Sequence, residues 1–229
     1  VEDYARVAGM PVGYMQFIEI AREIDKTGIK LLIFDEPTAV LTETEADRLL
    51  DTMRVIASKG IEESTLMTLT DVVKDVLSDG DRSKYNDIVA FSGPAHAEEV
   101  AAGMPTTIVS ACKRMKKAED VEALFRKSCI RVYTNPDVIG VELGGALKNV
   151  IAVAAGVCDG MGLGDNSKAA LITRGLVEMA RLGEKMGAKA ATFSGLTGMG
   201  DLIVTCESKH SRNRKAGFLM GQGRTMKQA

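Results

Sequence analysis

The hydrophobic pattern changes character at Asn135-Pro136, and this change constrains the fold more than any other feature of the chain. Before it, short apolar runs alternate with helical stretches: "DIVAFSG" (87–93), "TTIVSAC" (106–112), "KKAEDVEALFRK" (116–127) and "CIRVYT" (129–134). Strands that alternate with helices are typical of a parallel α/β sheet. Because no strand pattern follows residue 136, we predict an α/β part and then an all-helical part.

Hydrophobic spacing predicts the remaining elements. The run "VELGGALKNVIAVAAGVCDG" (141–160) is apolar almost all round, as expected of a helix buried inside a helical domain. Asn166-Ser167 offers an N-cap for a second helix over 168–187. Nearer the start of the sequence, the pattern predicts helices over 12–25, 43–57 and 65–77 and a buried strand over 30–35.

The composition excludes several classes of protein. The 229 residues carry a net charge of −2, which argues against a general nucleic-acid binder. No apolar run approaches the length of a bilayer span, and the first residues show no signal-peptide pattern. The four cysteines lie far apart in sequence and fit free thiols of a reducing compartment. We therefore expect a cytoplasmic protein without a membrane span or a nucleic-acid partner.

Lys148 is a polar residue in the middle of the apolar run, and two interpretations of it are open. A helix lysine usually extends its ammonium to the surface. Here the neighbours, such as Leu147, Val150 and Ile151, leave little polar face toward which it could extend. A desolvated lysine has a lowered pKa, which suits it to accept the proton of an alcohol while a hydride leaves carbon.

Two further polar features also allow alternatives. Asp201 follows closely spaced glycines in "GLTGMGDL", where it could cap a helix or act as a carboxylate in a substrate site. The segment "KHSRNRK" (209–215) could be a solvated basic loop, a nucleic-acid patch or a phosphate site. In the last case, Arg212 offers a planar pair of donors to a phosphate, and Ser211 and Asn213 add neutral hydrogen bonds.

The stretch "LLIFDEPTAVLTETE" (31–45) ends an apolar strand in Asp35-Glu36, as a Walker B motif does. Together with "PVGYMQFIEIARE", it resembles the ATP-binding subunit of a sugar ABC transporter. An ATPase also needs a Gly-x-x-x-x-Gly-Lys-Ser/Thr loop, and the sequence has none. We therefore interpret residues 1–57 as an ATPase-like segment without ATPase chemistry; a transport ATPase is the alternative function.

From Lys59 onward, six motifs occur together: "SKGIE", "FSGPAHAEEVAAG", "RVYTNPDVIGVELGGALKNV", "GLGDN", "GLTGMGDLIVTC" and "SRNR". In this order they resemble the bacterial NAD(P)-dependent glycerol-3-phosphate dehydrogenases. The resemblance implies a partial Rossmann-like parallel sheet over 58–135. It also implies a helical domain like that of 6-phosphogluconate dehydrogenase over 136–229. The implied reaction interconverts sn-glycerol 3-phosphate and dihydroxyacetone phosphate for phospholipid synthesis.

The resemblance also implies roles for particular residues. Lys148 would be the catalytic proton acceptor. The substrate would be bound by Lys59, Gly93, Ala95, Asp201, Ser211, Arg212 and Asn213, and the cofactor would be contacted by Lys59, Ala97 and Arg212. Ala95 departs from the family's usual Ser or Thr, so a hydroxyl contact is lost there. No metal is implied.

The resemblance implies NAD or NADP as cofactor and a homodimer, but the family's Gly-x-Gly-x-x-Gly/Ala loop is missing from the sequence. A transporter-like segment stands in its place, so we interpret the chain as chimeric. We expect weak cofactor affinity and little dehydrogenase turnover. A catalytically inactive module that still binds phosphate is a third possibility.

Overall fold

The computed structural model describes residues 55–56, 59–77 and 88–229. The helix expected over 12–25, the strand expected over 30–35 and the Walker B-like stretch lie outside these residues. Val55–Ile56 form strand β1, although the sequence predicts the end of a helix there. Helix α3 spans Leu69–Leu77 and begins four residues later than predicted, because the residues before it form a turn.

Four strands make one sheet in the order β1-β2-β3-β4, with β2 at Val89–Ser92, β3 at Thr106–Ala111 and β4 at Ile130–Asn135. Strand β1 pairs with β2 in parallel, and so does β3 with β4. Strand β3 instead runs antiparallel to β2, with Phe91 opposite Ser110. The prediction of a wholly parallel sheet is therefore wrong at this pair. The connection contains only the five-residue helix α4, Ala97–Ala101, whereas a parallel crossover usually carries a longer helix.

The two faces of the sheet pack against different helices, because successive side chains of a strand point to opposite faces. Helix α5, Met115–Phe125, covers one face, where Phe125 stacks on Phe91 with ring centroids 5.2 Å apart. On the other face, Ala90 and Ala111 pack against Val141 in the first turn of helix α6, Val138–Gly160. The alternation places Ser92, at the end of β2, on the face that carries Ala90.

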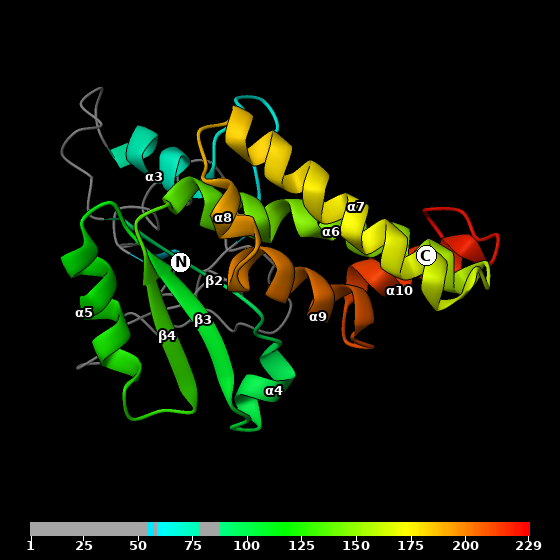
Figure 1. Cartoon of the computed structure of the whole chain (residues 1–229), viewed down its shortest axis with the longest axis horizontal. Helices are drawn as coiled ribbons and strands as arrows, with labels where there is room; N and C mark the ends of the chain where they lie inside the picture. The colour runs from blue at the N-terminus through cyan, green and yellow to red at the C-terminus, as the bar shows by residue number, and fades with distance from the viewer. Residues whose placement is uncertain (1–54, 57–58, 78–87) are drawn as a thin grey trace, which may run out of the picture.

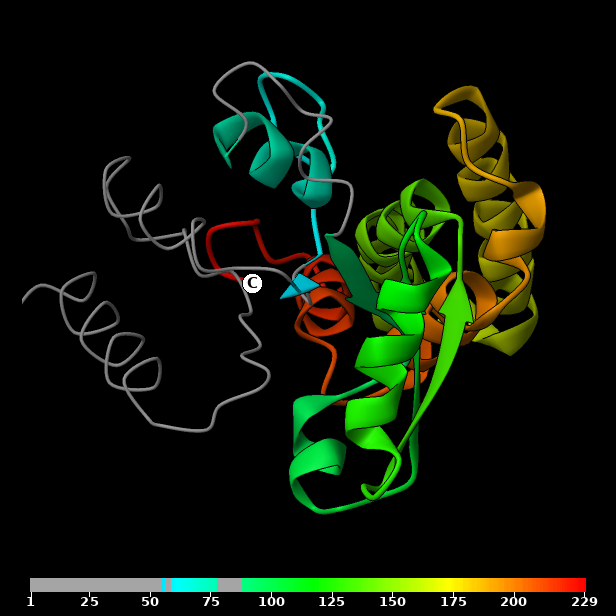
Figure 2. The same cartoon turned by 90° about the vertical axis from the view of Figure 1, so that its left-hand side faces the viewer.

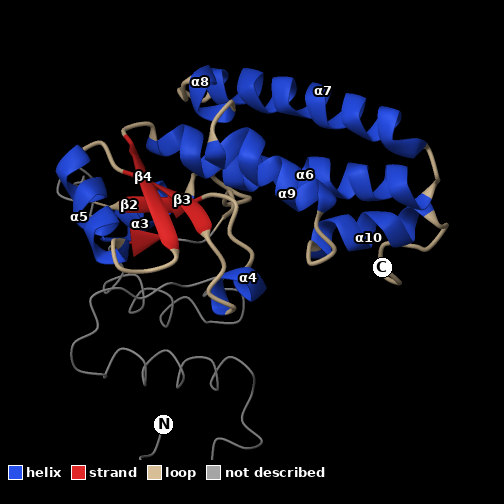
Figure 3. Cartoon of the chain, turned by 60° about the horizontal axis from the view of Figure 1, so that its bottom comes forward, coloured by secondary structure: helices blue, strands red, loops and turns tan. Residues whose placement is uncertain are grey.

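The helical part is built around α6, Val138–Gly160 (Figure 1). Helix α7, Gly164–Lys185, runs beside it, and α10, Arg212–Gly221, packs on another side (Figure 3). The short elements α8 at Ala190–Phe193, the π-helix η2 at Leu196–Gly200 and α9 at Asp201–Glu207 complete this part. The strand-then-helix organisation predicted from the sequence is confirmed.

The start of α7 differs from the prediction. The helix begins at Gly164, ahead of Asn166-Ser167, and the N-cap residue Leu163 makes no side-chain cap hydrogen bond. The preceding helix does have a side-chain cap, because Asp137 accepts a hydrogen bond from the amide of Gly140.

Helix α6 is long and apolar enough to cross a membrane by length and composition alone, so the expectation that no run approaches that length is wrong. Its position identifies it as a core helix. Leu143, Ala152 and Ala155 are buried in a cluster with residues of α7, α8 and α9. Helix α10 can approach α6 closely because Gly217 has no side chain; a Cβ there would collide with the backbone of Val153.

Candidate active site

Lys148 lies in the middle of α6 on the side that faces α9, and the residue is only 6% exposed. Its ammonium donates a hydrogen bond to Asp201 Oδ1 at 2.5 Å and another to Thr205 Oγ1 at 2.7 Å. The side chain therefore does not extend to the surface. Of the two interpretations left open by the sequence, the desolvated lysine agrees with the structure.

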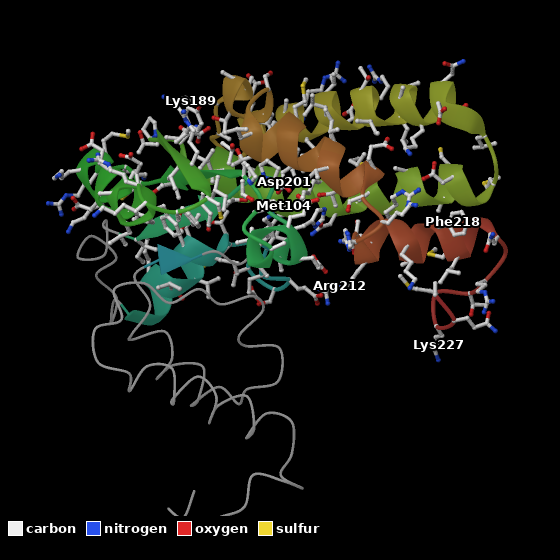
Figure 4. The ribbon with its side chains drawn as sticks, turned by 90° about the horizontal axis from the view of Figure 1, so that it is seen from below. Met104, Lys189, Asp201, Arg212, Phe218 and Lys227 are labelled. Carbon is white, nitrogen blue, oxygen red and sulfur yellow. The ribbon has the colours of Figure 1, made fainter. Side chains whose placement is uncertain are left out.

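Asp201 is the first residue of α9, directly after the π-helix η2, and it is 1% exposed. The helix N-cap is Gly200, and the cap makes no side-chain hydrogen bond. The carboxylate is instead shared between two ammonium groups, Lys148 on Oδ1 and Lys59 on Oδ2 at 2.7 Å. The capping interpretation of Asp201 is therefore wrong. Figure 4 shows Asp201 in the middle of the described ribbon.

Lys59 reaches this cluster from the loop before α3. Besides its ion pair with Asp201, it donates to the carbonyl oxygen of Gly93 at 3.3 Å. Gly145 of α6 permits this approach, since a Cβ there would lie 3.2 Å from the Lys59 stem and 2.8 Å from Ser92 Oγ. The cluster thus joins the loop before α3, the end of β2 and the helical part.

The electrostatics of the cluster favour a lysine that can release its proton. Burial lowers the pKa of Lys148 to about 8, and the positive charge of Lys59 acts in the same direction. The charge and hydrogen bond of Asp201 raise the pKa but do not offset these effects. A lysine with such a pKa is partly neutral near pH 8 and can serve as a general base.

Thr205 is a member of the cluster that the sequence analysis did not identify. Its hydroxyl accepts from Lys148 and donates to the carbonyl oxygen of Asp201 at 2.5 Å. Because Thr205 and Asp201 are four residues apart on α9, they lie on one face of that helix. This spacing, read together with Lys148, is the signal by which the sequence could have revealed Thr205.

The predicted phosphate residues lie around the start of α10. Ser211 is buried, and its hydroxyl caps the helix by accepting from the amide of Arg214 at 3.2 Å. Asn213 is half-buried, and Arg212 is exposed at the first position of the helix. In Figure 4, Arg212 lies at the edge of the ribbon, away from Asp201. These three residues are therefore not bonded to the lysine cluster.

The structure places the three residues predicted around β2 in different surroundings. Gly93 is buried, and its backbone carbonyl meets Lys59. Ala95 packs against the core between the sheet and α5, so its side chain belongs to that core. Ala97 is exposed at the start of α4.

The two histidines also meet at this junction. The rings of His96 and His210 have centroids 6.2 Å apart, although the sequence separates them by more than a hundred residues. The Nε2 atom of His96 is buried and has no hydrogen-bond partner among the described residues. The loop after β2 and the loop before α10 are therefore neighbours.

Family models match two stretches of the chain. Residues 137–229 match the C-terminus of NAD-dependent glycerol-3-phosphate dehydrogenase, and residues 30–118 match the N-terminus of the same family. Together the two matches cover most of the sequence. The N-terminal match begins at residue 30, ahead of the boundary expected at residue 57.

Similar proteins carry the same name. Glycerol-3-phosphate dehydrogenase [NAD(P)+] of Clostridium perfringens is 58% identical over 179 residues, which are 78% of this chain and 52% of that protein. The Bacillus cereus protein of that name is 58% identical over 172 residues, covering 75% of this chain and 50% of its own. The chain thus spans about half the length of the curated relatives that it matches.

Solved structures agree with these matches. The crystal structure of glycerol-3-phosphate dehydrogenase from Coxiella burnetii superposes with a TM-score of 0.68 at 36% identity, over 80% of this chain and 55% of that one. The enzyme of the same name from Saccharomyces cerevisiae also gives 0.68, at 26% identity, over 81% and 57%. By its two family matches and these relatives, the chain belongs to the NAD-dependent glycerol-3-phosphate dehydrogenase family.

Proposed function

We propose that this chain carries the proton-transfer and substrate-binding half of an NAD(P)-dependent glycerol-3-phosphate dehydrogenase. The observation on which this rests is the buried cluster of Lys148, Asp201 and Lys59, with its lowered lysine pKa. A general base needs to be near neutrality at working pH and held by fixed neighbours. Family membership then supplies the reaction, the interconversion of sn-glycerol 3-phosphate and dihydroxyacetone phosphate.

In this proposal, Lys148 Nζ takes the proton of the alcohol when glycerol 3-phosphate is oxidised and returns it when the ketone is reduced. Asp201 and Thr205 fix the direction of the ammonium, since each accepts one of its hydrogen bonds. The third position on Nζ faces a substrate oxygen; it is a lone pair when the amine accepts the alcohol proton and a hydrogen after the transfer. Lys59 contributes positive charge that lowers the pKa of Lys148 and stabilises negative charge on that oxygen.

The phosphate end of the substrate would meet the segment 211–213. Arg212 is exposed, so its guanidinium remains available to a phosphate, and Asn213 adds neutral donors. Ser211 is already used as a helix cap and contributes chiefly by fixing the start of α10. At Gly93 and Ala95, contact would come from the backbone, because neither side chain carries a polar group.

The cofactor class follows from the relatives, whose names specify NAD(P)+. Lys59, Ala97 and Arg212 are the residues proposed to contact it, and two of these three carry the positive charge that phosphates require. The sequence contains no Gly-x-Gly-x-x-Gly run, so the residues present do not fit the pyrophosphate part of a dinucleotide.

Ligand titration tests the substrate assignment without needing turnover. Calorimetry with sn-glycerol 3-phosphate and with glycerol should show at least roughly tenfold tighter binding of the phosphorylated compound. Lys148→Ala should retain this binding. In a version completed with a relative's dinucleotide-binding half, the same substitution should lower dihydroxyacetone phosphate reduction by roughly a hundred- to ten-thousand-fold. Equal affinity for both compounds would refute the substrate, and unchanged turnover would remove Lys148 from the reaction.

Further proposals concern the domain boundaries, the cellular location, the oligomeric state and the origin of the first segment. We propose the division into residues 1–57, 58–135 and 136–229, a cytoplasmic homodimer, and a transporter ATPase origin for the first segment. The last rests on the Walker B-like stretch. A continuous genomic read across codons 45–65 tests the chimeric origin, and size-exclusion chromatography with light scattering tests the dimer.

A further inference from the structure

Glu142 is a buried carboxylate of α6 outside the lysine cluster, and both of its oxygens are used by one residue of α3. Oε1 accepts from the backbone amide of Thr70 at 2.7 Å, and Oε2 accepts from the Thr70 hydroxyl at 2.7 Å. Both residues are buried, at 7% and 1% exposure. Burial raises the pKa of Glu142, whereas the Thr70 donors lower it. The carboxylate therefore holds the first turn of α3, where backbone amides lack partners in the helix.

The loop between Lys59 and Thr70 is stiffened by its own hydrogen bonds. Ile61 and Thr68 form an antiparallel bridge across its base. Within the loop, the carboxylate of Glu62 accepts from the amides and hydroxyls of Ser64 and Thr65. Figure 2 shows this loop and α3, in cyan and teal, standing to one side of the sheet. Because the loop is stiff, a displacement of Thr70 at one end would also displace Lys59 at the other.

The two ends of this loop are fastened to the helical part at different places. At Thr70 the fastening is Glu142 of α6, and at Lys59 it is Asp201 of α9. A quarter of the Lys59 side chain is exposed. Its ion pair with Asp201 must therefore offset the conformational entropy that a lysine side chain loses when it is fixed. The Glu142 contact fixes Thr70, at the other end of the hydrogen-bonded loop that begins at Lys59.

We propose that Glu142 is a positioning residue, which holds the loop from Lys59 to Thr70 on α6 so that Lys59 remains paired with Asp201 beside Lys148. This inference deepens the proposed function, because it names a determinant of the ionisation of the proposed base. It is tested by the titration of Lys148, which requires neither cofactor nor turnover. A failure of the dehydrogenase assay and a failure of this inference are therefore separate results.

The test measures the pKa of Lys148 in the full chain by NMR with lysine labelled with ¹³C at Cε. Lys59→Met calibrates the readout, since removing this neighbour should raise the pKa of Lys148 by on the order of one unit. Glu142→Ala should raise it by at least about half as much, because Lys59 leaves Asp201. The direct effect of deleting a negative charge would lower the pKa instead, so the sign separates the two explanations.

Asp137→Ala is the matched control. Asp137 is another buried carboxylate of the same chain region, and it fastens α8 through the Lys189 amide and the Thr192 hydroxyl. Its loss should lower the unfolding midpoint much as Glu142→Ala does and leave the pKa of Lys148 unchanged. If both variants lower the midpoint and neither raises the pKa, Glu142 is merely structural and the inference is overturned.

Thr70 provides a second route if Glu142→Ala fails to fold. Thr70→Val deletes one donor to Glu142 and keeps the amide, so the pKa of Lys148 should rise in the same direction by a smaller amount. Thr70→Ser keeps the hydroxyl and should titrate like the parent chain. Equal titrations of Lys148 in the valine and serine variants would overturn the inference.

Discussion

Within the described residues, two groups of ion pairs join the helices around buried lysines, and they shift the pKa of Lys148 and that of Lys168 in opposite directions. In the first, Lys148 and Lys59 share Asp201, and the pKa of Lys148 is lowered to about 8. In the second, Lys168 pairs with Asp159 at 3.3 Å and with Glu207 at 2.9 Å, and Arg214 also pairs with Asp159. Burial acts to lower the pKa of Lys168, but the hydrogen bonds and charges of Glu207 and Asp159 raise it.

In both groups burial acts to lower the lysine pKa, and the two groups differ in the charges that act beside it. The two lysine side chains are 7% and 8% exposed. The first group has two cations for one carboxylate, and the second has two cations for two carboxylates. An excess positive charge favours the neutral amine, whereas a balanced group holds its lysine charged. Only the first group can supply a base near neutral pH.

The largest expected effect comes from Asp201→Asn, which leaves the buried ammonium of Lys148 and the partly exposed ammonium of Lys59 without a counter-charge. We expect the free energy of unfolding to fall by roughly 3–5 kcal/mol, because an uncompensated buried charge is costly. Urea unfolding at pH 7 measures it. Glu207→Gln is the control, since that side chain is 54% exposed and Lys168 keeps Asp159; its cost should be roughly 0–1 kcal/mol. If Asp201→Asn and Glu207→Gln lowered the free energy of unfolding equally, the contrast between the two ion-pair groups would be contradicted.

A smaller effect is expected from pH. The folded pKa of Lys148 is about 8 and the ordinary value is 10.5, so the unfolded chain binds more protons between these values. Stability should therefore gain from this group as pH rises through that window, by at most roughly 1.4 kcal/mol per unit. Lys168, with its raised pKa, contributes stability that is lost only above its ordinary value.

The measurement for this prediction is the difference in unfolding free energy between the parent chain and Lys148→Met from pH 7 to 10. The Cys206 thiol, whose pKa burial raises to about 11, acts in the opposite direction and is present in both chains. The difference should rise with pH. If the difference in unfolding free energy stays constant with pH, the pKa of Lys148 is not lowered in the folded protein.

The smallest expected effect concerns the two arginines of "SRNR". Arg212→Ala should change the free energy of unfolding by less than about 0.5 kcal/mol, because the side chain is exposed. Arg214→Ala removes an ion pair to Asp159 and should cost roughly 1–3 kcal/mol. Affinity for glycerol 3-phosphate should instead fall in Arg212→Ala. Thermal unfolding measures the stability of both variants, and calorimetry measures their affinity for glycerol 3-phosphate. If Arg212→Ala lost stability and Arg214→Ala lost affinity, the two roles would be reversed.

The sequence identified most elements that lie in the described residues. Strands β2, β3 and β4 and helices α5, α6 and α7 were predicted from apolar spacing, because such spacing reflects which face of an element is buried. The direction of β3 relative to β2 was missed, since strand direction depends on how the connection returns. The strand at Val55–Ile56 was also missed, because two residues carry no usable periodicity.

For the site, the sequence favoured a desolvated Lys148 as one of two open interpretations, because an apolar helix leaves little polar face. The groups that surround this lysine became known from the folded structure. Asp201, Thr205 and Lys59 come from segments far apart in the chain, and the approach of Lys59 depends on the absence of a side chain at Gly145. The spacing of apolar residues along one helix or strand shows which of its faces is buried. The charges that act on a pKa beside burial come from neighbouring residues, and tertiary packing decides which residues are neighbours.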